Sequence, residues 1–405
     1  MKILQICVEG NTGSTGTIAE SIGELVLQNG WESYIAFGRF QRPSRSKLIR
    51  IGSDFETILH GIETRLFDNH ALASRQATKR LIKKIELIKP DVIHLHHLHG
   101  YYVNIEILFN FLKKSQIPVV WTFHDCWSFT GHCGFFDYVG CEKWKELCFD
   151  CPQMNEYPKS LFIDRSKLNY KLKKQLFTSI PDLVIVSVSK WLDNLVSQSF
   201  FKAQKHIVIY NGVDINFFKP SKDSNLIRQK YALTDKFVLL GAATTWERRK
   251  GLEDFIFLSS LLNEDEVIVL VGLSKKQIKS LPSNIIGLTR TENKKEMVDL
   301  YSASDVFLNL SDEESFGLTT VESMACGTPV IVYNRTVSPE IVKDTGIIVE
   351  KGNFKELQFA IQKIREKGKI NFSKECRTRV IDNFYDNERY AEYIDLYNKI
   401  LPNDN

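Results

Sequence analysis

The 405-residue sequence has no apolar run that approaches the length of a membrane span, and it has no short-period repeat or low-complexity stretch. Charge of one sign is also scarce, because the net charge is only +4. That balance is too mild for a nucleic-acid binder, although residues 1–209, with 26 Lys/Arg against 20 Asp/Glu, would suit an anionic partner or membrane surface. The first eight residues become polar too early for a signal peptide, so we expect a cytoplasmic protein with reduced cysteines.

Apolar runs alternate with helix-like segments twice along the chain, which is long enough for two domains. The predicted strands are residues 3–8, 34–37, 91–95, 119–123, 183–187 and 207–210, then 237–241, 267–271, 285–287, 306–310 and 330–332. Such buried strands predict parallel sheets covered on both faces. We therefore predict an α/β fold of two facing, doubly wound, Rossmann-like domains, 1–209 and 210–385, with an interdomain cleft and hinge closure over it. Residues 386–405 are predicted to form a helix that returns to the first domain.

Two glutamates, Glu314 and Glu322, stand eight residues apart between a predicted strand and the end of a predicted helix over 318–326. In open α/β sheets, ligands bind at the carboxyl ends of the strands. Glu322 has no packing reason to stand among apolar helix residues. Both carboxylates are therefore candidate ligand-binding groups.

The segment Glu314–Val330 resembles the Glu-x7-Glu signature of retaining glycosyltransferases of group 1 (family 4), which have the GT-B fold. Asn211–Asp214 resembles the interdomain turn of that family, Tyr301–Val306 the stretch before its signature strand, and Thr122–Asp125 its N-domain histidine motif. The similarity covers essentially the whole chain in the right order. It implies a hexosyltransferase that needs no cofactor for its chemistry. The enzyme would move a sugar from a UDP- or GDP-sugar to a saccharide acceptor, often polyprenyl-linked, in surface-polysaccharide assembly.

Lys250 is the candidate for the donor diphosphate, because it follows a strand and directly precedes a predicted helix N-terminus. The family usually places an arginine several residues earlier, where this chain has Thr244 and Thr245. We therefore predict that Arg249 or Arg248 supplies the second charge. A solvated charge run is the alternative interpretation.

The resemblance implies that Glu322 accepts hydrogen bonds from the ribose hydroxyls and that Glu314 contacts the transferred sugar, so that Glu314, Lys250 and His124 carry the catalysis. A carboxylate can accept from both hydroxyls of a vicinal diol. The alternative for Glu322 is a helix-dipole interaction. Backbone amides and the base-side loop complete the predicted donor site, at Phe316, Gly317, Leu318, Arg290 and Thr291.

The glycine-rich stretch 10–17 follows the first strand and lacks the Gly-x-Gly-x-x-Gly spacing. The second strand ends in Gly38-Arg39 rather than in an acidic residue. Both observations argue against nicotinamide binding. Gly13, Ser14 and Gly16 are predicted to contact the diphosphate or the acceptor, with a simple connecting turn as the alternative. His124 would touch the donor or position the acceptor; a hydrogen-bonded core histidine is the alternative.

Four cysteines, Cys133, Cys141, Cys148 and Cys151, cluster inside a predicted insertion over 126–160. Clustered reduced thiols suggest structural zinc, with Cys126 and His132 as reserve ligands; free cysteines, a disulfide or another metal are the alternatives. Four histidines crowd the end of one strand, at His94, His96, His97 and His99, and suit either polar lining of the cleft or a metal.

Two basic stretches favour contact with anionic lipid. One is a predicted loop carrying Arg39, Arg42, Arg45, Lys47 and Arg50, and the other is an amphipathic helix over 167–177. A helix packed on the sheet is the alternative for the second stretch. For the whole chain, a sugar-nucleotide epimerase of the same fold and a non-catalytic zinc-containing binding protein are the alternatives to a transferase.

Overall fold

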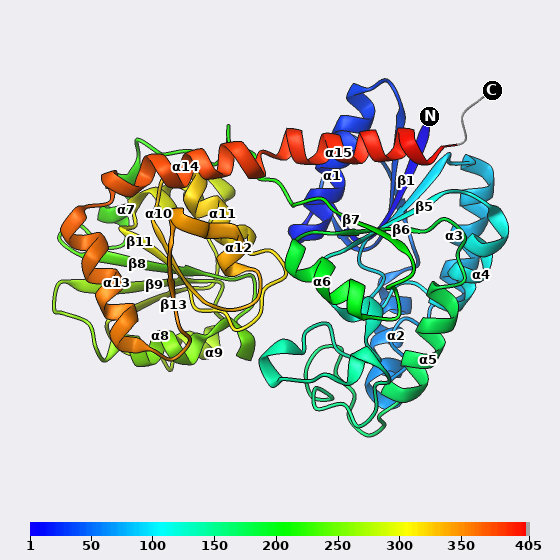
Figure 1. The fold of residues 1–405 in the computed structure, drawn as a ribbon, viewed down its shortest axis with the longest axis horizontal. Helices are drawn as coiled ribbons and strands as arrows, with labels where there is room; N and C mark the ends of the chain where they lie inside the picture. Colours follow the sequence, from blue (N-terminus) through cyan, green and yellow to red (C-terminus); the bar gives the residue numbers. More distant parts are fainter. Residues whose placement is uncertain (402–405) are drawn as a thin grey trace. The chain divides into compact units, whose positions relative to one another are not determined.

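The structure is a computed structural model that describes residues 1–401. It divides into two compact units (Figure 1). Unit 1 holds Met1–Asn211 and the segment that starts at Asn387, and unit 2 holds Gly212–Asp386. The last four residues of the predicted C-terminal segment 386–405 lie outside the described residues.

The core of unit 1 is a fully parallel sheet with the strand order β3-β2-β1-β4-β5-β6-β7. Its inner strands are near-continuous apolar runs whose side chains are mostly buried, as in β5, where every residue is buried, whereas the edge strands β3 and β7 are partly exposed. The strands are β1 (Lys2–Gly10), β2 (Glu32–Gln41), β3 (Lys47–Arg50), β4 (Val92–Leu95), β5 (Val119–Phe123), β6 (Val184–Ser187) and β7 (Lys205–Val208). The helices are α1 (Gly13–Gln28), α2 (Asp54–Phe67), α3 (Arg75–Ile88), α4 (Ile105–Ser115), α5 (Ser166–Phe177), α6 (Lys190–Gln198) and α15 (Asp386–Ile400), with short 3₁₀ turns η1 (Trp127–Phe129), η2 (Asp137–Val139) and η3 (Lys143–Lys145).

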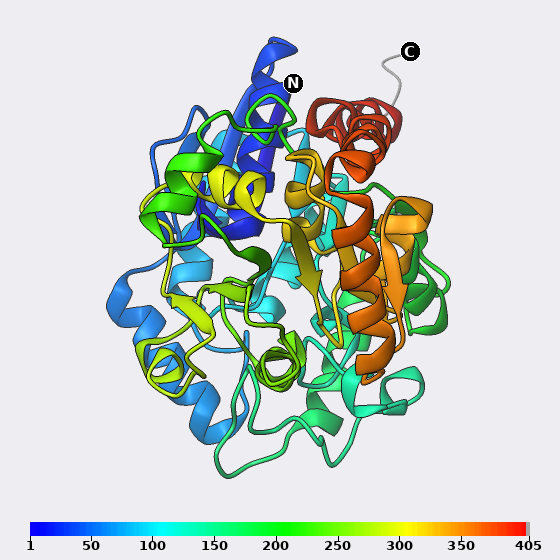
Figure 2. The ribbon, with the colours of Figure 1, turned by 90° about the vertical axis from the view of Figure 1, so that its left-hand side faces the viewer.

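Unit 2 repeats the plan with a second parallel sheet in the order β10-β9-β8-β11-β12-β13, and helices flank its strands on both sides (Figure 2). Its strands are β8 (Phe237–Ala242), β9 (Glu266–Val271), β10 (Ile285–Leu288), β11 (Val306–Asn309), β12 (Val330–Tyr333) and β13 (Ile347–Val349). Its helices are α7 (Ser224–Lys230), α8 (Leu252–Ser259), α9 (Lys275–Ile278), α10 (Lys294–Ala303), α11 (Leu318–Ala325), α12 (Ser338–Val342), α13 (Phe354–Lys367) and α14 (Ile370–Phe384), with 3₁₀ turns η4 (Arg248–Lys250) and η5 (Lys343–Thr345). The two doubly wound, Rossmann-like sheets are those predicted from the sequence.

Each sheet has a topological switch point, because the chain winds outward in one direction and then in the other. In unit 1 the switch lies between β1 and β4, and in unit 2 it lies between β8 and β11. The loops that leave these strands diverge to opposite faces of the sheet and leave room between them for a ligand. The loops after β8 and β11 carry Lys250 and Glu314, and the segments after β1 and β4 carry the glycine-rich stretch and the histidines.

The helix α15 packs on unit 1 through buried tyrosines. The Tyr397 hydroxyl lies 2.6 Å from His94 Nδ1, and the Tyr393 hydroxyl lies 3.0 Å from Thr122 Oγ1. The chain passes from unit 1 to unit 2 after Asn211 and returns after Asp386, and the segments next to these two points are hydrogen-bonded to each other. The Val213 amide donates to the Phe384 carbonyl oxygen at 2.8 Å.

Three details of the prediction are wrong. The predicted basic loop is partly strand, because Arg39 lies in β2 and Lys47 and Arg50 lie in β3. There Lys47 pairs with Glu32 and Arg50 with Asp54, which neutralises two of its charges. The last strand of unit 1 is Lys205–Val208 rather than 207–210, and β13 is absent from the predicted strands of unit 2. The helix α1 begins at Gly13, so its first turn contains the candidate glycines.

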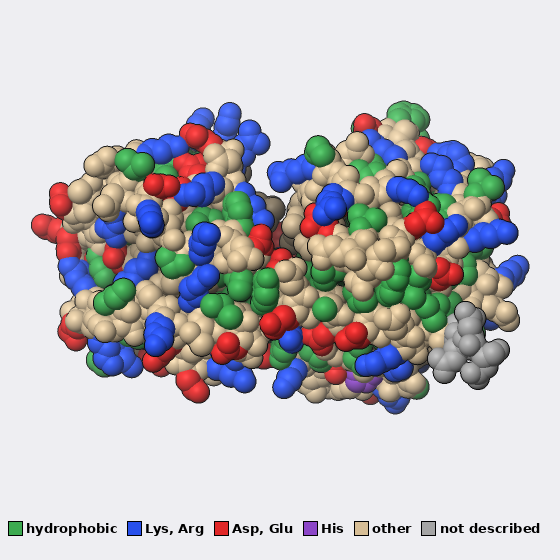
Figure 3. All heavy atoms as spheres, turned by 90° about the horizontal axis from the view of Figure 1, so that it is seen from above, with side chains coloured by type: hydrophobic (Ala, Val, Ile, Leu, Met, Phe, Trp, Pro, Cys, Tyr) green, Lys and Arg blue, Asp and Glu red, His purple; other side chains and the backbone are tan. Residues whose placement is uncertain are grey.

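Among residues 1–401, no helix is both long and apolar enough to cross a membrane. On the face drawn in Figure 3, Lys and Arg side chains are spread among Asp and Glu.

Candidate active site

The loops that follow β8 and β11 are joined by their backbones at the switch point of unit 2. The Asp312 amide donates to the Arg249 carbonyl oxygen at 2.7 Å, and Arg249 Nη1 donates to the Glu313 carbonyl oxygen at 2.9 Å. Gly251 ends η4 at φ 73°, and a Cβ there would lie 2.0 Å from the Leu310 carbonyl oxygen. Glycine is therefore the residue that lets the two loops approach so closely.

Lys250 and Glu314 form an ion pair in which both side chains are largely buried. Lys250 Nζ lies 2.5 Å from Glu314 Oε1, and the same oxygen accepts from Ser311 Oγ at 3.1 Å. Lys250 and the neighbouring Arg249 hold the pKa of Glu314 below its usual range, against the effect of burial. Glu314 Oε1 carries both of these bonds, so Oε2 is the oxygen left to accept from a ligand hydroxyl.

Glu322 lies in α11, four residues after its first residue, and is half-buried. Its Oε2 accepts from the Tyr301 hydroxyl at 2.9 Å. Burial raises the pKa of Glu322 to about 7, although the Tyr301 hydrogen bond and the Lys294 charge oppose the rise. A carboxylate in this setting is poised to accept hydrogen bonds near neutral pH.

The remaining predicted donor residues of unit 2 lie around these carboxylates in sequence and fold. Gly317, at φ 84°, precedes the first residue of α11, which is Leu318. Phe316 is buried and packs edge-on against Phe384, with ring centroids 5.6 Å apart, so its side chain anchors the loop that precedes α11. Arg290 and Thr291 follow β10 at the edge of the sheet, and Arg290 is exposed.

In unit 1 the helix α1 starts directly after β1 and presents its N-terminus at the switch point. Gly13 and Ser14 are exposed in its first turn, where backbone amides have no helical partner. Gly16 is buried, and a Cβ there would lie 2.8 Å from the Glu9 carbonyl oxygen. Glu9 itself is held close by, which places a carboxylate beside an otherwise anion-attracting helix start.

A relay of hydrogen bonds fixes the tautomer of His124. Gln5 Nε2 donates to the Ala19 carbonyl oxygen at 2.7 Å, so Gln5 Oε1 faces His96 Nε2 at 3.0 Å and must accept from it. His96 Nδ1 is then an acceptor, and His124 Nε2, 3.1 Å away, donates to it. Burial and the adjacent histidines hold the pKa of His124 well below its usual range. His124 is therefore a neutral imidazole whose Nδ1 is a hydrogen-bond acceptor.

The other histidines of the predicted cluster have separate partners. His94 bonds Thr122 and α15, which is the polar-core arrangement. His99 Nε2 lies 2.7 Å and His97 Nε2 3.3 Å from Asp125 Oδ2. Among the residues that the structure describes, these three are the group whose ligand atoms lie within 4.8 Å of one another.

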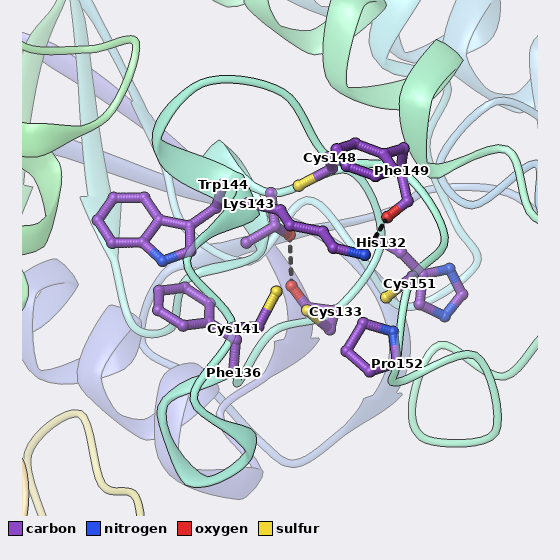
Figure 4. Close-up of a pocket in the computed structure, with 11 residues that line it drawn as sticks. His132, Cys133, Phe136, Cys141, Lys143, Trp144, Cys148, Phe149, Cys151 and Pro152 are labelled. Atoms are coloured by element: carbon purple, nitrogen blue, oxygen red, sulfur yellow. Dashed lines mark hydrogen bonds between the residues drawn. The ribbon is translucent and has the colours of Figure 1, made fainter.

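The four clustered cysteines line one pocket of unit 1 with Phe136, Trp144 and other residues (Figure 4). The structure thus brings Cys133, Cys141, Cys148 and Cys151 together. None of these four cysteines forms a disulfide bond.

Comparisons with known proteins agree with this architecture. The family model described as "Glycosyl transferases group 1" matches residues 223–384, and that of "Glycosyltransferase Family 4" matches residues 25–217. The chain belongs to the group 1 glycosyltransferases. This glycosyltransferase is 24% identical over 360 residues to WcaC of Escherichia coli K12, which is assigned to colanic acid biosynthesis, with 85% of this chain and 86% of WcaC covered. It is 27% identical over 342 residues to alpha-monoglucosyldiacylglycerol synthase of Acholeplasma laidlawii, with 79% of each chain covered.

Among solved structures, the glycosyltransferase is similar to Anabaena Alr3699/HepE in complex with UDP-glucose. The TM-score is 0.69 at 15% identity, with 99% of this chain and 100% of HepE covered. This likeness supports the GT-B fold.

Three site residues lie outside the sequence prediction. Tyr301 was noted only as part of a family-like stretch, yet its hydroxyl bonds Glu322. Gln5 was read as a residue of a buried strand, and a polar side chain with no exposure in such a strand is the signal that could have identified it. Asp125 stands in the histidine motif, but its two histidine partners come from the neighbouring strand end.

Proposed function

We propose that this glycosyltransferase moves a hexose, with retention of configuration, from a UDP- or GDP-sugar to a lipid-linked saccharide in surface-polysaccharide assembly. The observation that carries the proposal is the Lys250–Glu314 pair at the switch point of unit 2, with Glu322 in the helix that follows. The name of WcaC supports a role in polysaccharide assembly, and that of the Acholeplasma synthase supports an acceptor with a lipid part. The UDP-glucose complex of HepE supports the donor class.

The donor groups divide their work by charge. Lys250, assisted by Arg249, stabilises the negative charge that develops on the leaving diphosphate. Glu322 accepts from the ribose hydroxyls through the oxygen that Tyr301 leaves open. Glu314 Oε2 accepts from a hydroxyl of the transferred sugar, while Oε1 stays bound to Lys250.

Retention follows from same-face attack. An ion-paired carboxylate bonded to Lys250 and Ser311 is a poor nucleophile, so Glu314 does not attack the sugar. The bond from the anomeric carbon to the phosphate oxygen breaks, the acceptor oxygen bonds that carbon on the same face, and the acceptor proton passes to the leaving phosphate. His124, as a neutral acceptor, positions the reacting sugar.

Thermal shifts against UDP-, GDP- and ADP-sugars would identify the donor, and NMR of the product would give its anomeric configuration. We expect one nucleotide class to stabilise the protein and the product to keep the donor configuration. Lys250→Met and Glu314→Ala should each lower kcat by about 10²-fold or more in protein that remains folded, whereas the exposed control Lys279→Met should transfer as wild type does. Because each substitution breaks a largely buried ion pair, the melting temperature should also fall relative to the control. Transfer that survives both substitutions, or an inverted product, would overturn the proposal.

Peripheral attachment to an anionic membrane is part of the same proposal. The helix α2 turns an apolar stripe to solvent, in which Phe55 is 68% and Ile58 60% exposed. Phe162, 78% exposed, lies in a segment joined to α2 by the Leu161 amide, which donates to the Arg65 carbonyl oxygen at 2.8 Å. The start of the lysine-bearing helix α5 also contacts α2, through the Arg165 amide and Asp68. An apolar stripe beside exposed lysines suits an anionic lipid surface.

Co-sedimentation with vesicles of anionic or zwitterionic lipid tests this attachment. We expect binding to anionic vesicles that falls about tenfold in Ile58→Glu. The control Leu87→Glu changes a more exposed apolar residue, on α3, and should bind as wild type does. A dimer in solution that Ile58→Glu dissociates, without lipid binding by wild type, would assign the stripe to a protein interface instead.

A further inference from the structure

The segment between η1 and α5 contains no helix longer than the one-turn elements η2 and η3, and no strand, among its described residues. Such a long stretch without regular hydrogen bonding needs another source of order. Aromatic packing supplies part of it, because Phe136 stacks on Trp144 at 4.9 Å and Phe129 lies 5.4 Å from the same indole. The cysteine pocket lies directly against this aromatic cluster.

The four thiols converge on one space (Figure 4). Cys133 and Cys148 are 7% and 9% exposed, and the other two are partly buried. Buried thiols from three separate turns meet here, and no apolar packing pattern requires four of them.

A backbone amide points at one of the sulfurs. The Gly131 amide donates to Cys148 Sγ at 3.2 Å. A hydrogen bond from an N–H group stabilises a thiolate more than a neutral thiol. This contact therefore favours negative charge on Cys148.

A buried cation beside the pocket lacks a carboxylate partner. Lys173 is 2% exposed, and its Nζ donates to the carbonyl oxygens of Trp127 at 2.8 Å and Thr130 at 3.1 Å. No carboxylate of the described residues forms an ion pair with it, and burial lowers the pKa of Lys173 to about 7. A buried ammonium is costly without nearby negative charge, which thiolates would supply.

His132 lines the same pocket with an atom that lacks a partner. Its Nδ1 lies 2.7 Å from Asp68 Oδ1, whereas its Nε2 is buried and has no hydrogen-bond partner in the described part of the chain. A carboxylate that holds the far nitrogen of a histidine is the usual support of a metal-bound imidazole. This second, independent feature also points to a cation.

We propose that Cys133, Cys141, Cys148 and Cys151 bind one Zn²⁺ as thiolates in a closed, structural site, with His132 beside it. Tetrahedral zinc–sulfur bonds of about 2.3 Å place the sulfurs about 3.8 Å apart. No three of the sulfurs now lie within 4.8 Å of one another, so binding draws them together by side-chain rotation. The double negative charge of a zinc tetrathiolate is offset by Lys173.

The zinc site supports the neighbouring Asp125–His99 pair of the histidine cluster. That this cluster lies on the acceptor side rests on the proposed function. Gly134 follows the first ligand; its carbonyl oxygen accepts from the Cys126 amide at 2.9 Å, and a Cβ there would lie 3.4 Å from Asp125 Oδ2. The Tyr157 hydroxyl, six residues after the last ligand, lies 3.2 Å from His99 Nδ1. Zinc therefore holds both flanks of the Asp125–His99 pair in place.

Elemental analysis of full-length protein purified without a histidine tag tests the site. We expect about one zinc per chain in wild type and less than about one fifth of that in Cys148→Ser and in Cys151→Ser. Two controls should keep their zinc. Cys376→Ser changes a buried cysteine of unit 2, and His97→Gln/His99→Gln disables the other group of candidate ligands.

If the cysteine variants fail to fold, wild-type protein in which Co²⁺ replaces Zn²⁺ provides the test. Wild type reconstituted with Co²⁺ should show thiolate-to-metal charge transfer and the intense visible bands of a tetrahedral site. Four results would each overturn the proposal. Wild type could contain no zinc, or both cysteine variants could keep it. Zinc could be lost only from the histidine variant, or the mass of the protein could show disulfide bonds. Wild-type protein that contains zinc but binds none of the UDP-, GDP- and ADP-sugars would count against the proposed function and leave the zinc site standing.

Discussion

Glu322 should make nucleotide binding depend on pH around neutrality. Burial raises the pKa of Glu322 to about 7. Ribose hydroxyls donate their protons, so the ionised carboxylate is the form that accepts from both of them. Because the pKa is raised, the ionised form is present above about pH 7 and is lost as the pH falls through that value.

The size of the effect follows from the ionised fraction. About nine tenths of the carboxyl is ionised one unit above its pKa and about one tenth one unit below. The apparent Kd varies inversely with the competent fraction, so it should rise about tenfold between about pH 8 and about pH 6. A tenfold change corresponds to about 1.4 kcal/mol.

Calorimetric titration with UDP or GDP across this range measures the effect. Glu322→Gln binds the same ligand without a titrating side chain, so the ratio of the two Kd values cancels the ligand's own phosphate ionisation. Tyr301→Phe removes a hydrogen bond that lowers the pKa of Glu322, and should move the midpoint to higher pH. A ratio that stays constant from acid to alkaline pH would refute the assignment of Glu322 to the ribose.

Three further outcomes are expected. Lys250→Met should lower kcat by about 10²- to 10³-fold because the leaving diphosphate loses its cation, and equal rates for this variant and Lys279→Met would remove Lys250 from the site. Gly251→Ala should cost about 3 kcal/mol or more in urea unfolding, because its Cβ meets a carbonyl oxygen at 2.0 Å, whereas Gly352→Ala, at φ 75° with nothing within 4 Å, should cost about 1–2 kcal/mol. Gln5→Leu should allow His96 and His124 to change tautomer, so ¹⁵N NMR should show a mixture of forms where wild type shows one. The kcat should fall about tenfold. A single, unchanged tautomer in this variant would contradict the relay.

The strands that carry the site could be predicted because they are buried on both faces. Burial leaves a continuous apolar run in the sequence, as at Val119–Phe123, where prediction and structure agree. The edge strand Lys47–Arg50 leaves no such run, because its ends are exposed and charged, and it was predicted to be loop. Edge strands are routinely protected by such charges, which hides them from a pattern search.

Side-chain partners were harder to predict than the residues themselves. The place of Glu322 in the sequence identifies it as a candidate. Its partner Tyr301, whose hydroxyl donates to Glu322, lies 21 residues away. The relay through Gln5 and His96 spans 91 residues and exists because β1 and β4 pair in one register. Register between distant parallel strands is a property of the folded sheet, and no local pattern encodes it.

The position of α15 has a consequence for how the protein is made. Unit 2 is one uninterrupted stretch of chain, so it can fold as soon as that stretch leaves the ribosome. Unit 1 precedes unit 2 in the chain, yet His94 and Thr122 wait for Tyr397 and Tyr393, which follow all of unit 2. Unit 1 therefore begins to fold before unit 2 is made and completes its core only afterwards, and His94 stays without its tyrosine partner while unit 2 is synthesised.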